Sequence, residues 1–477
     1  MKIKIHQSIE ESNGLIILPF FENEAGVAFP KGLSEKSIST KLFTGKKDSH
    51  YLFEDEKGLY LLLGLGKSDT HYKTIQTAFR RVTAKHESII ENEISIIFPE
   101  AFDSDQIQAA ITGLKLGTYR LAHFKKSEPK KKDWDQVNLN LFSNGSDLDK
   151  IAEYSLTLAT AQLETMKMVD LPSNEATPAY LANWAKEKSK ALGFKATVLE
   201  RKEAEALGLH AFLAVSQGSS VKKSPRFIIA EYRNEKATKH LGLVGKGVTF
   251  DTGGLNIKTA GMVHMKCDMG GAAAVLGALA AVASLSLPVN LTAIVPCVEN
   301  SIDKDSFLPS DVINSYSGKT IEIIDTDAEG RLILADGLSY LIKNYEIDTV
   351  IDLATLTGSA VGTFGYECAA LFSKDQVLLD ALQKAGSDVG EKMWPLPMWD
   401  TYASEMDSEI ADIKNYHGKP FAGAITAAKF LEAFTDSHAS WAHIDIAGTA
   451  FGDSEFAKTK HATAYGVHLI VKLIENM

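Results

Sequence analysis

Cysteine is scarce in this chain of 477 residues, which contains only Cys267, Cys297 and Cys368. Three is an odd number, and so few thiols in so long a chain do not form the disulfide framework that stabilises small secreted proteins. We therefore expect reduced core thiols in a cytoplasmic protein. The first ten residues also lack an apolar stretch of signal-peptide length, so export by that route is not expected.

Positive charge is also in short supply, because 50 Lys and Arg residues face 61 Asp and Glu residues and leave a formal charge of -11. Proteins that bind phosphate backbones normally need a basic field, so nucleic acid is not an expected partner. The stretch from His123 to Asp135 is a local exception that we interpret as a solvated loop. Its lysines are Lys125, Lys126, Lys130, Lys131 and Lys132.

The chain has no long lipid-facing run of leucines. The longest apolar segment, Gly270 to Leu287, consists mainly of alanine, glycine and other weakly hydrophobic residues. A membrane span needs about 20 strongly apolar residues. We therefore expect a buried helix here and no membrane partner.

The length and composition predict a two-domain globular protein, with 45% hydrophobic and 23% charged residues. Short apolar runs alternate with helical patterns throughout, which is typical of an α/β fold. We expect a smaller N-terminal α/β domain at residues 1–150, a linker helix at 151–168, and a larger C-terminal α/β domain at 169–477 with a central, mostly parallel sheet. The runs predicted as strands are Leu15–Leu18, Tyr60–Leu63, Ile94–Phe98, Phe227–Ala230, Leu241–Val244, Leu291–Pro296, Thr349–Leu353 and Ala442–Ile446.

Candidate chemistry begins where the run Leu241 to Val244 enters a glycine-rich turn with Lys246 and Asp251. A phosphate-binding P-loop would require Ser or Thr directly after the Gly-Lys pair, and Gly247 stands there. The Asp-Thr-Gly triplet at Asp251 is typical of aspartic proteases, but that chemistry needs a second triplet, and the chain has none. Both interpretations are therefore rejected.

Further acidic and basic residues follow this turn at positions expected near strand ends, where open α/β sheets place their sites. Several carboxylates cannot ionise together in a closed cleft without cations, and divalent metals such as manganese, magnesium or zinc suit oxygen ligands. The spacing of two in Asp327-x-Glu329-x-Arg331 places the three side chains on one side if the backbone is extended there. The two residues that complete the set are Lys258 and Asp268.

The stretch Asp325 to Leu332 resembles the signature of the leucine aminopeptidase family, also called cytosol aminopeptidases. The likeness covers the chain from Asp170 to its end, while the first 150 residues match only loosely. Its other motifs are Gly245–Gly254, Met265–Gly271, Asp352–Gly358, Gly423–Ala428 and Trp441–Ala450.

The resemblance implies two divalent metal ions per subunit, Mn²⁺ or Zn²⁺, with Mg²⁺ or Co²⁺ also possible. Asp251 and Glu329 would bridge the ions, Lys246 and Asp268 would complete one site, and Asp327 would complete the other. Lys246 would have to be neutral to act as a ligand. Two further side chains would be catalytic rather than ligands, namely Lys258 and Arg331.

The function implied by the resemblance is an aminopeptidase that removes apolar, leucine-like N-terminal residues from peptides by means of a water activated by two metals. Arg331 would hold bicarbonate as a proton shuttle, and the subunits would form a homohexamer. Alternatives are a narrower dipeptidase, such as a cysteinylglycinase, and a DNA-binding regulator. The candidate substrate-binding residues are Met265, Thr355, Leu356 and Ala450.

The sequence departs from the family pattern at Asp325, at Asp170, in Leu308–Asp311 and in an interval between Lys258 and Asp268 that is one residue short, and two histidines near the motifs have to be considered as ligands. Asp325 stands where the family usually has asparagine, which places an extra negative charge beside the ligands. His264 lies four residues before Asp268, but no second histidine stands at ligand spacing. We expect neither His264 nor His443 to bind metal, and we interpret His443 as a buried histidine with its hydrogen bonds satisfied.

Overall fold

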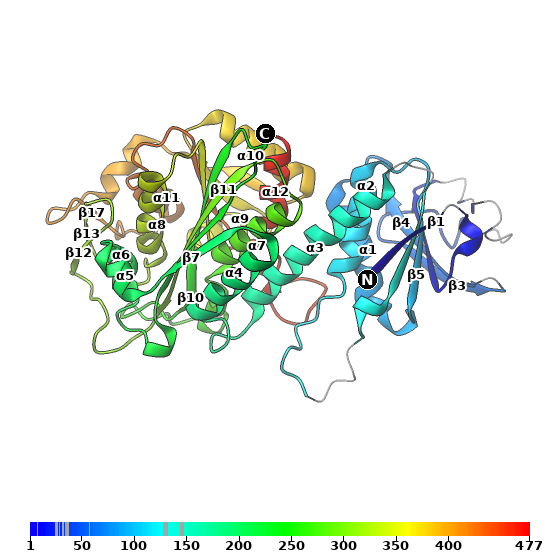
Figure 1. Cartoon of the computed structure of the whole chain (residues 1–477), viewed down its shortest axis with the longest axis horizontal. Helices are drawn as coiled ribbons and strands as arrows, with labels where there is room; N and C mark the ends of the chain where they lie inside the picture. The colour runs from blue at the N-terminus through cyan, green and yellow to red at the C-terminus, as the bar shows by residue number, and fades with distance from the viewer. Residues whose placement is uncertain are drawn as a thin grey trace. The chain divides into compact units, whose positions relative to one another are not determined.

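A computed structural model describes residues 1–6, 8–23, 27, 29–30, 33, 38–56, 58–126, 132–143 and 147–477. Lys130 and Lys131 of the lysine-rich stretch lie outside these ranges. The chain divides into two units, Met1–Thr160 and Ala161–Met477. Both are α/β units and the second is the larger, as predicted (Figure 1). The division lies inside helix α3, Leu148–Asp170, which contains the segment predicted as a linker helix.

The N-terminal unit contains a six-stranded sheet in the order β1-β6-β5-β2-β4-β3. All neighbours pair in parallel except the edge strand β3, which runs antiparallel to β4. The three strands predicted in this part are confirmed as β2, β4 and β5. The elements are β1 (Lys2–His6), η1 (Ile9–Glu11), β2 (Leu15–Phe21), β3 (His50–Asp55), β4 (Gly58–Gly66), α1 (Tyr72–Lys85), η2 (Glu87–Ile89), β5 (Glu93–Ile97), α2 (Ser104–Leu116), η3 (Trp134–Gln136) and β6 (Asn138–Phe142).

The two faces of this sheet are buried in two separate cores. Residues from α1 and α2, such as Phe79 and Ile111, join one face in the larger core. Aromatic residues, including Phe43 and Tyr60, join the other face in a second, smaller core. Alternate residues of β2 enter different cores, Ile17 the first and Ile16 the second, as the two-residue period of a strand requires.

The C-terminal unit is built on a nine-stranded sheet whose main path is β16-β15-β18-β14-β9-β11-β8-β7, with β10 also paired to β11. The central strands β18, β14, β9 and β11 are parallel, which confirms the predicted mostly parallel sheet. The elements are α4 (Pro178–Leu192), β7 (Lys195–Leu199), α5 (Arg201–Ala206), α6 (His210–Val215), η4 (Val221–Lys223), β8 (Arg226–Tyr232), β9 (His240–Gly245), β10 (Gly247–Asp251), η5 (Met262–Cys267), α7 (Gly270–Ser284), β11 (Asn290–Asn300), β12 (Val312–Asn314), β13 (Thr320–Glu322), α8 (Gly330–Asn344), β14 (Thr349–Ala354), α9 (Gly358–Phe364), β15 (Ala369–Ser373), α10 (Gln376–Val389), β16 (Met393–Pro395), η6 (Asp400–Met406), β17 (Ile413–Lys414), α11 (Gly423–Glu432), β18 (Trp441–Asp445), β19 (Phe451–Gly452), β20 (His461–Ala462) and α12 (Val467–Glu475).

Helices α7 and α8 pack on the same central strands from opposite faces. A Cβ on Gly242 would lie 2.7 Å from Cδ2 of Leu341 in α8. A Cβ on Gly245 would lie 2.8 Å from the Cα of Ala272 in α7. The odd spacing of the two glycines points them to opposite faces of β9, so each allows one helix to approach the strand closely.

Helix α7 is buried from Gly270 to Ala283, as predicted for this apolar segment. The longer stretch Met262–Ser284 is, among the described residues, long and apolar enough to cross a membrane by length and composition alone. In its most apolar 18-residue window, however, 89% of the residues are buried inside the protein, as in the core helix of a globular domain.

Candidate metal centre

The carboxyl ends of the central strands carry the candidate site. Lys246 directly follows β9, Thr355 directly follows β14, and Asp251 is the last residue of β10. Parallel strands end at the same edge of a sheet, and open α/β sheets bind ligands there. The fold thus brings together side chains that are more than a hundred residues apart.

The turn after β10 contains glycines that allow a close backbone approach. Gly253 has φ of 87°, a conformation that L side chains rarely adopt. A Cβ on Gly253 would lie 2.5 Å from the carbonyl oxygen of Asn256 and 2.9 Å from Oδ1 of Asp327. Glycine at this position therefore leaves room for the Asp327 carboxylate.

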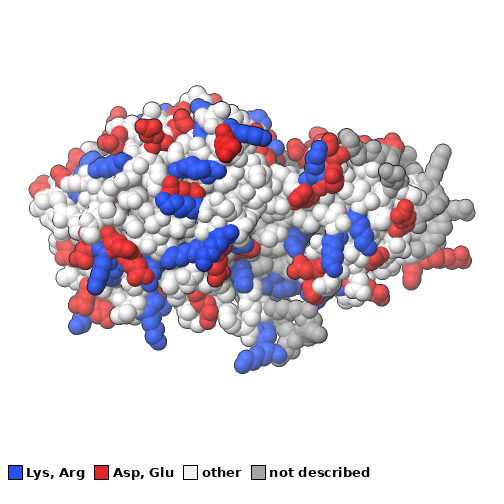
Figure 2. Space-filling model, viewed as in Figure 1, with Lys and Arg blue, Asp and Glu red and all other residues white. Residues whose placement is uncertain are grey.

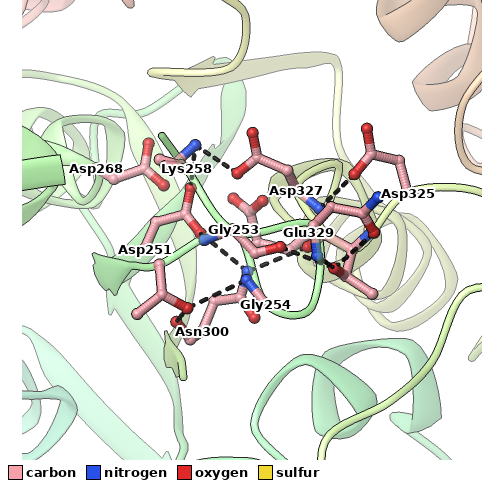
Figure 3. Close-up of polar contacts among 12 residues, drawn as sticks. Asp251, Gly253, Gly254, Lys258, Asp268, Asn300, Asp325, Asp327 and Glu329 are labelled. Atoms are coloured by element: carbon pink, nitrogen blue, oxygen red, sulfur yellow. Dashed lines mark hydrogen bonds and ion pairs between the residues drawn. The ribbon is translucent and has the colours of Figure 1, made fainter. Parts of the chain in front are cut away.

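Three buried carboxylates form the centre of the site (Figure 3). Asp251, Asp268 and Glu329 each offer one oxygen, and these oxygens all lie within 4.8 Å of one another. Among the described residues, Oδ2 of Asp268 and Oε2 of Glu329 are buried without a hydrogen-bond partner. Buried acceptors normally have partners, so two such oxygens in one cluster fit a cation-binding site.

Lys246 occupies the inner side of the cluster and is 3% exposed. Its Nζ lies 2.7 Å from Oδ1 of Asp268, 3.0 Å from Oε1 of Glu329, and 2.9 Å from the carbonyl oxygen of Thr355. Burial lowers the pKa of this ammonium group, but the surrounding carboxylates outweigh burial and hold the pKa above its ordinary value. A lysine with these partners stays protonated unless a metal replaces the proton.

Lys258 forms the outer side of the cluster. Its Nζ lies 2.8 Å from Oδ2 of Asp251 and also pairs with Oδ1 of Asp327. Burial lowers the pKa of Lys258, yet Asp251, Glu329 and Asp327 together raise it above its ordinary value. Lys258 therefore remains a cation beside the carboxylates.

The pKa values of the acidic side chains in the cluster are also shifted. Burial raises the pKa of Asp268 well above its usual value, and Glu329 and Asp251 raise it further. Burial and the charge of Asp251 likewise raise the pKa of Glu329. Asp327 is raised to a pKa of about 7 by burial and by the same neighbours. Among the described residues, these four carboxyl groups form ion pairs with two lysine ammoniums, those of Lys246 and Lys258, and this negative surplus fits divalent cations.

The backbone from Asp327 to Arg331 is not extended, so the condition under which the spacing of two would align the three side chains is not met. Asp327 lies in a turn, where its N–H donates to Oδ1 of Asp325 at 2.8 Å. Glu329 has helical angles, φ of -74° and ψ of -34°, and α8 begins at the next residue. The spacing of two reflects a turn that leads into a helix, and the local sequence did not distinguish this from a strand.

Arg331 lies in the first turn of α8 and is 5% exposed. Its Nη1 donates to the carbonyl oxygen of Asn415 at 2.8 Å. Within the described part of the chain, its Nε is buried without a partner. Burial lowers the pKa of this guanidinium to about 10, so it remains charged at neutral pH.

The candidate substrate-binding residues are placed unevenly around the cluster. Thr355 belongs to it directly, because its Oγ1 donates to Oδ1 of Asp268 at 2.9 Å. Ala450 lies close by, since a Cβ on Gly270 would be 3.0 Å from the Ala450 Cβ and 3.1 Å from Thr355 Cγ2. Leu356 directly follows Thr355, and Met265 lies in η5, where its carbonyl oxygen accepts the N–H of Asp268 at 3.4 Å.

Sequence reasoning missed several polar residues that hold the cluster in place. Nδ2 of Asn300 donates to Oδ1 of Asp251 at 2.8 Å. Oδ1 of Asn415 accepts the N–H of Ile324 at 2.8 Å, and its Nδ2 donates to the carbonyl of Asp325 at 2.6 Å. These asparagines are isolated in the sequence. The only sequence feature that could have indicated either asparagine is the position of Asn300 at the end of an apolar strand.

The two histidines lie outside the cluster. His443 is fully buried, and its Nδ1 lies 2.5 Å from Oδ1 of Asp352. His443 is thus buried as predicted, but the expectation that its hydrogen bonds are satisfied is wrong, because its Nε2 has no partner among the described residues. The ring of His264 packs against Phe451 with centroids 5.8 Å apart.

Comparison with known proteins agrees with this geometry along the whole chain. Residues 164–471 match the catalytic-domain model of the cytosol aminopeptidase family, and residues 24–128 match its N-terminal-domain model. A probable cytosol aminopeptidase of Syntrophotalea carbinolica is 40% identical over 93% of this chain and 92% of its own. One from Chlorobaculum parvum is 44% identical over 78% of this chain and 76% of its own.

Solved structures show the same fold. A mutant of tomato leucine aminopeptidase superposes with a TM-score of 0.88 at 29% identity, covering 100% of this chain and 97% of its own. The bottromycin maturation enzyme BotP, solved in complex with manganese, gives 0.85 at 26% identity over 98% and 99%. These matches define a hydrolase of the aminopeptidase class. The chain belongs to the cytosol aminopeptidase family.

Proposed function

We propose that the chain is a metal-dependent aminopeptidase that removes apolar, leucine-like residues from the free N-terminus of peptides. The observation that carries the proposal is the buried cluster of Asp251, Asp268 and Glu329, with two carboxylate oxygens that have no partner among the described residues. Family membership gives the reaction class, and the cluster supplies a place for the cations.

The proposed ligands divide into two sites that share a pair of carboxylates. Asp251 and Glu329 would be shared, Lys246 and Asp268 would complete one site, and Asp327 would complete the other. Two divalent cations, Mn²⁺ or Zn²⁺ with Mg²⁺ or Co²⁺ as alternatives, would supply the charge that activates a water and polarises the scissile carbonyl. The donor set, one amine and four carboxylates, is compatible with these ions.

Two cationic side chains are left for catalysis. Lys258 points its ammonium at the cluster and would donate to the oxygen on which negative charge develops. Arg331 would hold a small anion such as bicarbonate, since its charge is retained and its Nε has no partner among the described residues. A bound bicarbonate would accept and return a proton during hydrolysis.

The substrate side chain would contact the apolar edge of the cluster. Thr355 and Ala450 lie there, and Leu356 and Met265 adjoin it, so we propose these four as substrate-binding residues. A small apolar pocket favours leucine-like residues over charged ones. We further propose a cytoplasmic homohexamer, by analogy with the family.

The surface gives little support to the DNA-binding alternative. Figure 2 shows that, among the residues coloured in this view, lysine and arginine side chains are interspersed with aspartate and glutamate. A nucleic-acid site would need clustered positive charge, and the net charge is -11. Peptides therefore remain the proposed partners.

The test is hydrolysis of leucine p-nitroanilide, Leu-Gly and longer leucyl peptides by chelator-stripped protein, before and after addition of Mn²⁺, Zn²⁺ or Co²⁺. We expect no activity without metal and recovered activity with it. Folded protein that stays inactive with every metal would contradict the proposal. Turnover restricted to dipeptides would instead support the narrower dipeptidase.

A further inference from the structure

Asn300 is a buried residue opposite the proposed ligand Asp251. It ends β11 and is 0% exposed. Strand β10 carries one extra residue relative to β11, because Val248 pairs with Val298 whereas Asp251 pairs with Asn300. Such a bulge changes the direction in which the following side chain points. Here it places the Asp251 carboxylate beside the Asn300 side chain (Figure 3).

The side-chain amide of Asn300 makes two directed hydrogen bonds. Its Nδ2 donates to Oδ1 of Asp251 at 2.8 Å and to the carbonyl oxygen of Thr326 at 3.1 Å. An ionised carboxylate and a backbone carbonyl can only accept hydrogen bonds. The amide nitrogen must therefore face both of them, which fixes the orientation of the amide group.

These two bonds join the separate segments that carry the proposed ligands. Asp251 comes from β10, whereas Thr326 directly precedes Asp327 in the loop that leads into α8. Oγ1 of Thr326 also donates to the carbonyl oxygen of Gly253 at 2.7 Å. Because Gly253 lies in the turn after β10, this is a further hydrogen bond between the same two segments. The buried Asn300 amide is thus one of the links that hold the two segments together, and the one that contacts a proposed ligand directly.

We propose that Asn300 is a positioning residue of the metal centre, a role that rests on the proposed function. Oδ1 of Asp251 accepts hydrogen bonds from Asn300 and from the N–H of Gly253, the latter at 2.8 Å. With Oδ1 held by two neutral donors, rotation of the carboxylate is restricted and Oδ2 faces Lys258 and the cluster. Hydrogen bonds to ligating carboxylates typically contribute 10- to 100-fold in metal affinity.

The strand end does not depend on this side chain. The backbone carbonyl of Asn300 accepts from the N–H of Thr252 at 3.0 Å and from its Oγ1 at 2.9 Å. Substitutions that preserve side-chain volume should leave these bonds in place. A loss of metal affinity can therefore be separated from a loss of fold.

The experiment compares Asn300→Val with Asn300→Thr, two branched side chains of nearly equal shape of which only threonine retains a donor. Asn290→Val is the control at the opposite end of β11, where the Asn290 side chain accepts a hydrogen bond from the N–H of Asn234 at 3.1 Å. Mn²⁺ affinity is measured by chelator competition, and thermal unfolding is measured on metal-free protein.

We expect about 10- to 100-fold weaker Mn²⁺ binding in Asn300→Val, a smaller loss in Asn300→Thr, and none in Asn290→Val. Unfolding of metal-free Asn300→Val should remain cooperative and close to that of the wild type. Affinity within twofold of the wild type, or an unfolded Asn300→Val protein, would overturn the proposal. If the wild type itself binds no Mn²⁺, the proposed function fails instead.

Discussion

The two units differ in whether charged side chains are buried around their sheets. In the described part of the N-terminal unit, the buried polar residues are all uncharged, for example Gln76, Thr112 and Asn140. The C-terminal unit buries many charges, including Lys246, Glu329 and others, at the carboxyl edge of its sheet. Buried charge is costly unless it is paired or binds a cation. The same type of fold therefore forms an ordinary core in one unit and a candidate reaction centre in the other.

Removing a shared ligand should have the largest effect. Glu329→Gln keeps the shape of the side chain but removes the charge that both proposed metal sites use. We expect kcat/KM to fall at least about ten-thousandfold, equivalent to about 5 kcal/mol of transition-state stabilisation. The matched control is Glu93→Gln in β5 of the N-terminal unit, which should stay within twofold of the wild type. An equal loss of kcat/KM in Glu329→Gln and Glu93→Gln would show that catalysis does not depend on the C-terminal cluster in particular.

A cavity in the N-terminal unit should affect stability without affecting the site. Phe79 in α1 is fully buried, and Phe79→Ala should destabilise that unit by about 3–5 kcal/mol through lost burial and a residual cavity. Hydrogen exchange followed by mass spectrometry should show faster exchange in β4 and β5. Metal content of the protein should stay unchanged, and its loss would show that the units are energetically coupled.

The cation beside the cluster can be tested separately from the metal. Lys258→Met should lower kcat about 10²- to 10³-fold, as expected for loss of a donor to a developing oxyanion, with little change in bound metal. Lys188→Met is a control lysine whose ion pair with Glu164 lies on the helical surface of the same unit. Loss of metal in Lys258→Met would show instead that this lysine maintains the ligand geometry.

Asp336 is a buried carboxyl group with a structural role, away from the candidate reaction centre. Its carboxylate accepts the N–H groups of Phe212 and Tyr316 at 2.9 and 2.7 Å, and burial raises its pKa to about 7. The folded protein then holds a proton that the unfolded chain releases near pH 4. The free energy of unfolding should therefore fall as pH rises from about 4 to 7 and level off above that, with a slope of up to about 1.4 kcal/mol per pH unit.

Urea unfolding of metal-free protein at several pH values measures this slope. In Asp336→Asn the contribution of this residue to the pH dependence of the free energy of unfolding should disappear, even if the absolute stability also changes. Identical slopes for the wild type and Asp336→Asn would show that the carboxyl group titrates normally despite its burial.

The sequence was most informative where its signals were periodic or dense. Apolar runs such as Leu291 to Pro296 predicted the central strands, because strands buried on both faces read as continuous hydrophobic stretches. The acidic and basic residues after those runs predicted a clustered site. Both signals depend on neighbouring residues, which a single sequence displays directly.

The remaining features depend on contacts between distant segments. The turn at Asp327 and the helix that begins at Gly330 were not predicted, since a spacing of two does not report local dihedral angles. Asn300 and Asn415 act through partners 49 and 90 residues away, respectively. Single asparagines have no pattern that marks them, so the supports of the site emerged only from the folded arrangement.

The central claim is that this cluster holds two divalent cations that hydrolysis requires. The most direct measurement is the number of Mn²⁺ ions bound per chain, by elemental analysis after dialysis, for the wild type, Asp268→Ala and Asp327→Ala, with leucine p-nitroanilide hydrolysis measured on the same samples. The account predicts two ions in the wild type, one in each variant, and activity only in the wild type. Full activity in metal-free wild type, or two ions in both variants, would contradict it.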